Sequence, residues 1–431
     1  MKTNYLLLFL SSILWLAGCT DKCKETRTYR RYTPVNYTLA QLRQGVHVEN
    51  AQTLVNPGKI YTKDQFLFIN ELKQGIHIID NRNPSSPKPV AFIRIPGNGD
   101  MAIRNNTLYA DSYMDLVTFD ISNLAAIKEV SRVPNVFPNG SFEGGWWSMD
   151  ATNQIVYDQN VSYVTETIET NCEENVTPTG GWGWFTTALS SNAQFSSADK
   201  AGGSTTTNGV AGSMARFALY SDYLYTISQS TMQLFNIKDP ANPKIGNQIQ
   251  LGWGIETIFP YKDKLFIGSQ SGMHIYNNSN PEKPERLSVF QHARVCDPVV
   301  VHDHTAYVTL RSGNQCGGFT NQLDVVDITD LVNPRLLKSY PMRNPHGLGV
   351  AYPNLFICEG AYGLKSFNIS DVMNIDRNLL DYIEDLNAYD VIPLEKSLLL
   401  IGKDGFYQFD ASNPRQLRQL SHIPISRPTY Y

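Results

Sequence analysis

Residues 75–87 read GIHIIDNRNPSSP, and residues 115–123 read DLVTFDISN. Each stretch is a short run of alternating apolar residues that ends in Asp and continues into a polar turn, often with proline. The same phrase returns at 232–243, 273–284, 323–334, 364–371 and 406–414. The residues that end the seven runs are Asp80, Asp120, Asn236, Asn277, Asp327, Asn368 and Asp410. Their separations are 40, 116, 41, 50, 41 and 42 residues, and a period near forty residues built of short strands predicts a β-propeller.

Each repeat divides into four expected strands. In the second repeat these cover 100–103, 107–110, 116–119 and 128–133, with a polar turn between the first two. Seven four-stranded units close into a ring that hides most strand edges. We therefore expect an all-β fold, a seven-bladed β-propeller of four-stranded blades over residues 52–423, followed by a C-terminal tail at 424–431.

The long separation between the second and third phrases predicts an insertion at about 135–212, between blades 2 and 3. Its composition differs from that of the repeats: it is rich in Gly, Ser and Thr, and residues 154–168 alternate enough to form a hairpin. A loop of this length in a compact fold is usually functional or disordered. Four tryptophans beside glycines are its candidate interaction residues: Trp146, Trp147, Trp182 and Trp184. Such side chains could stack on sugar rings or anchor a protein partner, or else pack the insertion onto the ring.

The N-terminus has the features of an export signal. Lys2 precedes an apolar run at 6–16 that is too short to span a bilayer, and the run ends in Leu-Ala-Gly-Cys at 16–19. This resembles a bacterial lipobox, which implies a signal peptide at 1–18 and a lipidated Cys19. Residues 19–51 are then the lipidated cysteine and a tether. We expect a membrane-anchored protein of the cell envelope, placed in the outer membrane, with the periplasmic or surface face left open.

Composition and cysteine spacing limit the remaining classes. The chain has 431 residues, 18% of them charged, and a net charge of −4, which gives no basic surface for nucleic acid. The envelope permits disulfides, and Cys296 with Cys316 is the preferred pair because both fall in one repeat; buried free thiols are the alternative. The sequence contains no Cys-x-x-Cys spacing of the kind that would predict a zinc site, and no residue is assigned as a metal ligand.

Aligning the first strand of every blade brings one polar position into register. The seven residues are Lys59, Asp100, Arg216, Glu256, Asp297, His346 and Asp390. Because the first strand of a blade lines the central channel, we expect these side chains to ring one mouth of it. Four acids with a lysine, an arginine and a histidine could bind a polar ligand or a cation such as Ca²⁺. The alternative is that they only satisfy neighbouring backbone groups and hydrate the channel.

The seven phrases, with the run at 56–61, Phe-Ile-Asn-Glu at 68–71 and Ala-Asp-Ser-Tyr at 110–113, resemble the LVIVD-repeat β-propeller proteins, many of them lipoproteins of Bacteroidetes. The resemblance covers about 52–423 and implies the fold; it implies no common activity. We expect a non-enzymatic binding or interaction module with a protein or glycan partner. One alternative is a hydrolase or lyase acting on glycans or lactones through the acidic channel mouth. Another is a structural subunit of a surface complex.

Overall fold

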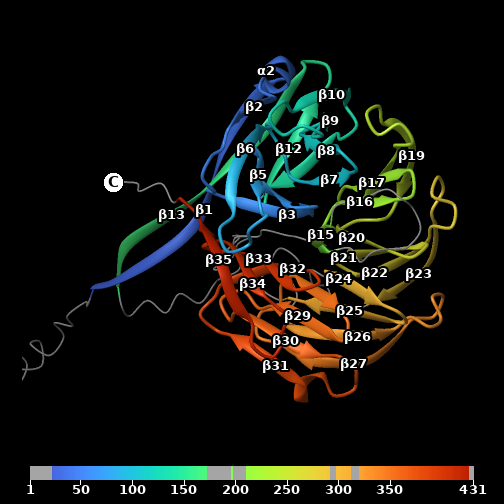
Figure 1. The fold of residues 1–431 in the computed structure, drawn as a ribbon. Helices are drawn as coiled ribbons and strands as arrows, with labels where there is room; N and C mark the ends of the chain where they lie inside the picture. The colour runs from blue at the N-terminus through green and yellow to red at the C-terminus, as the bar shows by residue number, and fades with distance from the viewer. Residues whose placement is uncertain are drawn as a thin grey trace, which may run out of the picture. The chain divides into compact units, whose positions relative to one another are not determined.

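The computed structural model describes residues 22–142, 144–171, 196–197, 210–291, 298–311 and 320–426. The chain forms two compact units. The larger unit contains Val35–Asp158 and the chain from Ser190 onward, and it holds all seven blades. Six blades are four-stranded antiparallel sheets, and the four strands of the first blade belong to a larger sheet, so the predicted seven-bladed propeller is confirmed. Figure 1 shows these sheets from β3 through β35.

The strands of the blades follow one another in sequence order. Blade 1 contains β3 (Pro57–Lys63), β4 (Phe66–Glu71), β5 (Gly75–Asp80) and β6 (Lys88–Arg94). Blade 2 contains β7 (Met101–Arg104), β8 (Thr107–Ser112), β9 (Asp115–Asp120) and β10 (Lys128–Val133). Blade 3 contains β16 (Phe217–Tyr220), β17 (Tyr223–Ile227), β18 (Thr231–Asn236) and β19 (Lys244–Gln250). Blade 4 contains β20 (Ile255–Tyr261), β21 (Lys264–Ser269), β22 (Gly272–Asn277) and β23 (Glu285–Gln291).

The remaining blades repeat this order. Blade 5 contains β24 (Val299–His302), β25 (Thr305–Leu310), β26 (Gln322–Asp327) and β27 (Arg335–Pro341). Blade 6 contains β28 (Leu348–Ala351), β29 (Asn354–Cys358), β30 (Leu364–Asn368) and β31 (Leu379–Ile383), with a 3-10 turn at Ile375–Arg377. Blade 7 contains β32 (Ala388–Pro393), β33 (Ser397–Gly402), β34 (Gly405–Asp410) and β35 (Arg418–Pro424). The first strands of successive blades are neighbours around the ring.

The core lies between adjacent sheets. The second and third strands of a blade are buried on both faces, as in β21 and β22 of blade 4, where nearly every residue is inaccessible to solvent. The fourth strand is at the rim and is mostly exposed, as in β19. A sheet covered on both faces needs near-continuous apolar strands, which explains why the inner strands are runs of Ile, Val, Leu and Phe.

Two consecutive side-chain-capped turns explain the repeated phrase. In every blade the Asp or Asn that ends the third strand accepts a hydrogen bond from the backbone N–H two residues later, at 2.8–3.3 Å. Three residues further on a second Asp or Asn does the same, at 3.0–3.2 Å. These Asx turns satisfy N–H groups that the ladder leaves open, which explains why Asp or Asn stands at both positions in every blade.

Blades 1 and 7 close the ring through side chains and a short bridge. The amides of Asn81 and Gln408 exchange hydrogen bonds of 2.9 and 2.8 Å. Leu54 and Ile425 form a parallel bridge, and the Ser426 N–H donates to the Leu54 carbonyl at 2.6 Å. Each blade is therefore complete within one stretch of sequence, and the two ends of the propeller meet at this seam.

The segment expected as a tether contains regular structure. It holds β1 (Lys22–Thr38), α2 (Leu39–Gln44) and β2 (His47–Asn50). Thr38 caps α2 through a capping box with Gln41, and β2 adds a fifth, outer strand to blade 1 by pairing with β6. The sequence offered no local sign of these pairings, because the partners of β1 and β2 lie far along the chain.

The insertion supplies three strands to a separate sheet. These are β11 (Asn139–Phe142), β12 (Gly145–Asp150) and β13 (Ile155–Asn171), in the order β1-β13-β12-β11. The hairpin predicted at 154–168 was wrong, since β13 is one continuous strand whose second partner is β1. In the smaller unit, the threonine pairs Thr26–Thr167 and Thr28–Thr165 face each other at 3.3 and 2.9 Å, as two antiparallel strands require.

The end of the insertion lies among the first strands of the blades. The strand β15 (Val210–Ser213) pairs with β3, and β14 (Ser196–Ser197) pairs with β15. Both also neighbour β28 and β32 across the ring. Figure 1 shows β15 next to β3 at the centre of the blades. The central channel is therefore occupied by the chain's own strand at this level, which the repeat pattern did not predict.

Candidate functional site

Two insertions interrupt the repeat, a long one at about 135–212 and a shorter one at 311–320, and both leave the ring at the same end. In an antiparallel four-stranded blade, the connection from the second to the third strand and the connection to the next blade emerge together. The long insertion links β10 to β16, and the shorter one at 311–320 links β25 to β26. We call this end the insertion face and the opposite end, which carries the Asx turns, the turn face. The seven aligned polar positions also lie at the insertion face, because they precede or begin the first strands.

Six of the seven aligned residues lie in the described part of the chain, and Asp297 lies outside it. Most of these side chains are buried, whereas side chains around an open channel mouth would be exposed to solvent. Lys59, Asp100, His346 and Asp390 are buried, whereas Arg216 and Glu256 are partly exposed. The structure brings the six into three local groups, one of which holds β15, and not into one open ring.

The first group joins Lys59, Asp100 and Arg216. The Lys59 ammonium donates to Asp100 Oδ2 at 2.5 Å, and the backbone N–H of Arg216 donates to the same oxygen at 2.6 Å. Burial lowers the pKa of Lys59, and the Asp100 carboxylate opposes this only in part. Asp100 thus ties blade 1 to the start of blade 3, and its charge is compensated within the protein.

The second group holds β15 in place. The Ser213 hydroxyl donates to Asp390 Oδ1 at 3.1 Å and accepts from the Leu348 N–H at 2.9 Å. Burial raises the pKa of Asp390 well above its ordinary value, although the Val391 N–H, Ser213 and Lys59 favour the ionised form. One hydroxyl therefore links the insertion to blades 6 and 7 in a site without solvent.

The third group lies across blades 4 to 6. His346 Nε2 lies 3.4 Å from Arg311 Nη1 and 3.2 Å from Asn344 Nδ2, so it acts as an acceptor for both. Burial, followed by the nearby Arg311 charge, lowers the pKa of His346 well below its ordinary value. Glu256 accepts from the Gln270 amide at 3.2 Å, and its charge partly opposes the burial that lowers the pKa of Arg311 to about 10. These contacts join side chains of blades 4, 5 and 6 that are buried or partly buried.

The first hairpin of the insertion packs onto blades 1 and 2 through aromatic rings. Trp147 is only 5% exposed and meets the Tyr113 ring edge-on at 5.3 Å, while Phe142 meets the same ring at 6.1 Å. Gly140 lies directly beneath Trp147, since a Cβ there would come within 2.5 Å of the indole nitrogen. Trp146 points the other way and is 50% exposed. Trp147 therefore holds the insertion on the ring, and Trp146 presents an indole to solvent.

A buried carboxylate supports this aromatic cluster. Asp158 Oδ2 accepts from the Lys73 ammonium at 2.8 Å and from the Tyr113 hydroxyl at 2.7 Å. Gly97 adopts φ +76° and leaves room for the Tyr113 ring, which a Cβ would approach to 2.1 Å. The position of the first insertion hairpin is therefore fixed by both apolar and ionic contacts.

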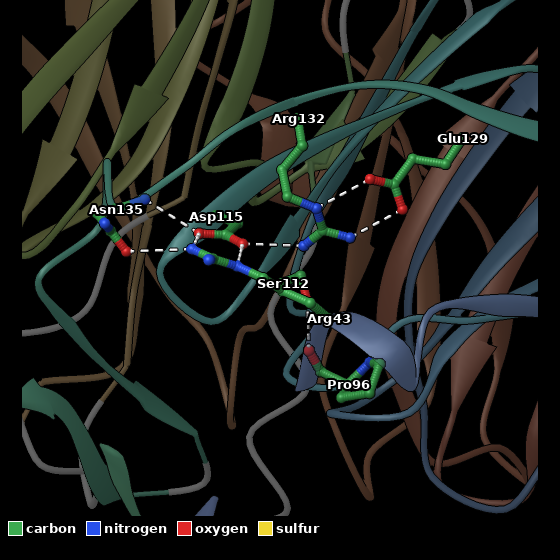
Figure 2. A network of polar contacts seen from close by, with 7 residues as sticks. All are labelled: Arg43, Pro96, Ser112, Asp115, Glu129, Arg132 and Asn135. Carbon is green, nitrogen blue, oxygen red and sulfur yellow. Dashed lines mark hydrogen bonds and ion pairs between the residues drawn. The ribbon is translucent and has the colours of Figure 1, made fainter. Parts of the chain in front are cut away.

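A second buried carboxylate, Asp115, fastens α2 to blade 2 (Figure 2). Its Oδ2 accepts from Arg43 Nε and Arg132 Nη1, both at 2.9 Å, and its Oδ1 accepts from the Asn135 N–H at 3.0 Å. Arg132 also makes a two-pronged pair with Glu129 at 2.8 and 2.9 Å. Burial alone would raise the pKa of Asp115, but Arg43, Asn135 and Arg132 outweigh it and hold the pKa below its ordinary value.

A small hollow remains between the first insertion hairpin and blades 2 and 3. Its volume is about 40 Å³, and it is lined by charged groups, by serines and by aromatic rings, among them Asp100, Asp111, Arg216, Trp147, Phe217 and Ser228. Asp111 Oδ1 accepts N–H bonds from Asn98, Gly99 and Asp100 at 2.7–2.9 Å. Burial nevertheless raises the pKa of Asp111 to about 6. Two residues singled out in the sequence, Arg216 and Trp147, both line this hollow.

The other predicted sites are partly outside the described residues. This holds for Cys19, for Cys296 with Cys316, and for Trp182 and Trp184. Cys358 is a buried free thiol whose pKa is raised by burial. In the part of the chain that the structure describes, no helix is long and apolar enough to cross a membrane.

The described ring residues do not assemble a cation site. Calcium takes six to eight oxygen ligands. Among the described residues, no three acidic, histidine or cysteine side chains lie together as a metal requires. Asp100 already forms an ion pair with the Lys59 ammonium, so its carboxylate is neutralised by a charge of the protein itself.

Four residues of this face were not predicted from the sequence. Trp253 is 69% exposed between two glycines of positive φ, Gly252 and Gly254, just before β20. The Gly-Trp-Gly triplet is a local signal that could have identified it. Arg311, Ser213 and Asp111 gave no such signal, because their roles depend on neighbours from other blades.

The architecture is that of a seven-bladed β-propeller, and comparison with known proteins adds the repeat class. The LVIVD repeat model matches residues 99–134 and 316–341, so these two segments are similar to LVIVD repeats. No curated protein matches the chain.

Several solved structures are similar to the chain in fold. The computationally designed Ika8 protein is 9% identical, with a TM-score of 0.49, over 88% of this chain and 92% of that one. Sqt1 of Saccharomyces cerevisiae is 9% identical, with a TM-score of 0.49, over 89% and 93%. BamB of Moraxella catarrhalis is 7% identical, with a TM-score of 0.47, over 88% and 97%.

Proposed function

We propose that the protein is a lipid-anchored binding module of the cell envelope and that the insertion face carries its ligand surface. The observation that supports this most is that both insertions interrupt the repeat at the same face. In repeat folds, insertions into single repeats map to loops on one face, which is often the binding face. The turn face, in contrast, repeats one local structure in all seven blades.

Exposed aromatic side chains add to this proposal. Trp146 and Trp253 are 50% and 69% exposed, and both belong to connections of the insertion face. Large exposed indoles have a cost in water and are enriched where proteins bind partners. Trp147 is excluded from this surface because it is buried.

The binding role can be tested with matched variants of the full chain. We expect Trp146→Ala combined with Trp253→Ala to abolish retention of the purified protein on isolated envelope polysaccharide or envelope protein. Val332→Ala is the control, because Val332 is 58% exposed in a turn of the opposite face. Equal retention of the double variant, the control and the unaltered chain would refute a ligand surface at the insertion face.

The membrane anchor is tested separately. Cys19→Ala should move the protein from the membrane to the soluble fraction, and mass spectrometry of the unaltered protein should find acyl chains on Cys19. An unmodified N-terminal peptide that still contains residues 1–18 would contradict the anchor without affecting the binding role.

A further inference from the structure

The connection between β19 and β20 is held in place on both sides of Trp253. Its backbone is bonded to the turns between the second and third strands of blades 3 and 4. Three hydrogen bonds of 2.8–3.0 Å do this: Leu251 N–H to Ser230 O, Ile255 N–H to Gln229 O, and Gln270 N–H to Gly254 O. Gly252 and Gly254 adopt φ +106° and +78°, which residues with a Cβ rarely do. The chain therefore places Trp253 at a defined position.

The Trp253 indole has no partner in its own fold. It is 69% exposed, and among the described residues its N–H makes no hydrogen bond and its ring meets no other ring. Trp147, in contrast, is 5% exposed and packs edge-on against Tyr113. The propeller therefore does not use the Trp253 ring for its own packing, although backbone bonds and two glycines determine where the ring is.

Polar groups with unused hydrogen-bonding capacity lie on both sides of this connection. The Gln270 side chain lies against Gly254, since a Cβ there would come within 3.0–3.3 Å of three of its carbon atoms. The Gln270 amide donates one N–H to Glu256 at 3.2 Å, which leaves its carbonyl oxygen and its second N–H open. On the other side, the Ser230 hydroxyl makes no hydrogen bond to any residue that the structure describes. An amide and a hydroxyl are therefore available next to the residue that carries the indole.

The exposed apolar surface here is a single isolated ring. From Met214 to Gln291, a range that the structure describes throughout, two large apolar side chains are exposed, Trp253 at 69% and Ile245 at 58%. Ile245 is at the turn-face end of β19, where it pairs with Phe235. A protein interface buries a contiguous patch with an apolar centre, which blades 3 and 4 do not present at the insertion face. A lone flat ring beside amide and hydroxyl groups instead matches a pyranose, which has C–H groups on its faces and hydroxyls around its edge.

We propose that Trp253 is the stacking surface for one neutral hexopyranose ring of an envelope polysaccharide, and that Gln270 and Ser230 bind its hydroxyls. The proposal deepens the proposed function and rests on it, because it names the ligand class of the insertion face. The ring is a neutral one because residues 227–231, 250–256 and 269–272 contain no lysine or arginine, and their one charged residue is an acid, Glu256. An acidic sugar would find no cation in these segments.

The test uses the full chain with Cys19→Ser, so that no lipid is attached, labelled with fluorotryptophan for nuclear magnetic resonance. The probes are three neutral pentasaccharides: cellopentaose, mannopentaose and N-acetylchitopentaose. At least one should bind saturably and shift the Trp253 resonance, which is identified by its absence from the spectrum of Trp253→Ala.

Calorimetric titration of the variants with the same pentasaccharide measures what each side chain contributes. Trp253→Ala should weaken binding about 10-fold, as expected for a lost stacking surface, and Gln270→Ala about 2- to 10-fold, as expected for a lost hydrogen bond. Ile245→Ala is the matched control, because it removes an exposed apolar side chain from the opposite end of the neighbouring strand, and it should bind normally. Trp253→Ala should keep the unfolding midpoint of the unaltered chain, since its ring has no partner to lose.

The outcomes separate this inference from the proposed function. If none of the three pentasaccharides shifts the Trp253 resonance, or if Trp253→Ala binds as tightly as the unaltered side chain, the inference is overturned. If Trp253→Ala loses retention on isolated envelope protein but not on envelope polysaccharide, the indole contacts a protein and the sugar assignment falls. If the Trp146 and Trp253 double variant loses envelope retention while Trp253→Ala keeps its pentasaccharide affinity, the binding face stands and this inference falls.

Discussion

The two faces of the ring are built on opposite principles. On the turn face, all seven blades repeat one pair of Asx turns, with the same donor and acceptor spacing in each. On the insertion face, the connections differ: one carries a hairpin that packs on Tyr113, and another exposes Trp253. The turn face shows what the repeat needs in order to fold. The connections of the insertion face do not follow the repeat, and ligand contacts are expected where connections vary.

The buried carboxylates sharpen this contrast. The turn-face acids are exposed or partly exposed and accept backbone N–H groups of their own turn, as Asp120 does from Ser122. On the insertion face, acids such as Asp115 and Asp158 are buried and accept from side chains of distant segments, as Asp115 does from Arg43. A local turn can lose its acid and still be held by the sheet, whereas a buried acid between segments leaves unpaired charges when it is removed.

The largest expected effect is therefore at Asp115. Asp115→Ala should lower the free energy of unfolding by about 2–4 kcal/mol, toward the lower end for a broken buried ion pair because Arg43 remains partly exposed. Urea unfolding measures the change. Asp120→Ala on the turn face is the comparison and should lower the unfolding midpoint much less. Equal losses for the two variants would break the distinction between the faces.

A smaller effect is expected at the strand in the centre of the ring. Ser213→Ala removes the hydroxyl that bonds Asp390 and the Leu348 N–H, and should cost about 1–3 kcal/mol in unfolding free energy. Hydrogen exchange of the Leu348 amide should become faster. Ser412→Ala on the turn face keeps its backbone bond to Asp410 and should be near neutral. A Ser213→Ala protein as stable as the control would mean that this hydroxyl does not fasten β15.

The smallest expected effect is on how the free energy of unfolding changes with pH, because the two faces contribute to it with opposite sign. Asp111 on the insertion face has its pKa raised from 3.8 to about 6 by burial, so its contribution is present below pH 4 and is lost as the pH rises through 6. Asp120 on the turn face has its pKa lowered by the Ser122 N–H, so its contribution is present above its ordinary pKa and is lost as the pH falls through the lowered value.

Carboxyl resonances in a pH titration check the directions of the two pKa shifts, and Asp111→Asn and Asp120→Asn check their link to stability. Asp111→Asn should flatten the fall of stability between pH 4 and 7. Asp120→Asn should flatten the fall at acidic pH and leave neutral pH unchanged, because an amide oxygen still caps the turn. Midpoints that move in the same direction for both acids would contradict the assignment.

The sequence predicted the blades because their signals are local. Alternation within a strand, and an Asp or Asn at the two turn positions, lie within about a dozen residues of each other, as at 115–123. The aligned positions were also found by register, and six of them can be placed at the insertion face. The register did not predict their hydrogen-bond partners, because Lys59 bonds Asp100 of the next blade and Asp390 bonds Ser213 of the insertion.

The insertion was located by the sequence as the segment that the repeat does not explain, but its structure was not. A hairpin was expected where β13 forms one long strand, because its partner β1 comes from the N-terminus, more than a hundred residues earlier. Trp146 and Trp147 are adjacent and look equivalent in sequence. Only the pleat of β12 and the Tyr113 ring decide that one is exposed and the other buried.

By itself, the sequence determined the seven blades, the capped turns and the segment that departs from them, because strand alternation and Asx turns are set by residues close together in the chain. The tertiary structure alone decided that the insertion's last described strand lies among the first strands of the blades, that four of the aligned polar side chains are buried, and that Asp390 among them bonds Ser213 of that strand. These features depend on which distant groups meet, and pairing between distant groups is not encoded in any local pattern.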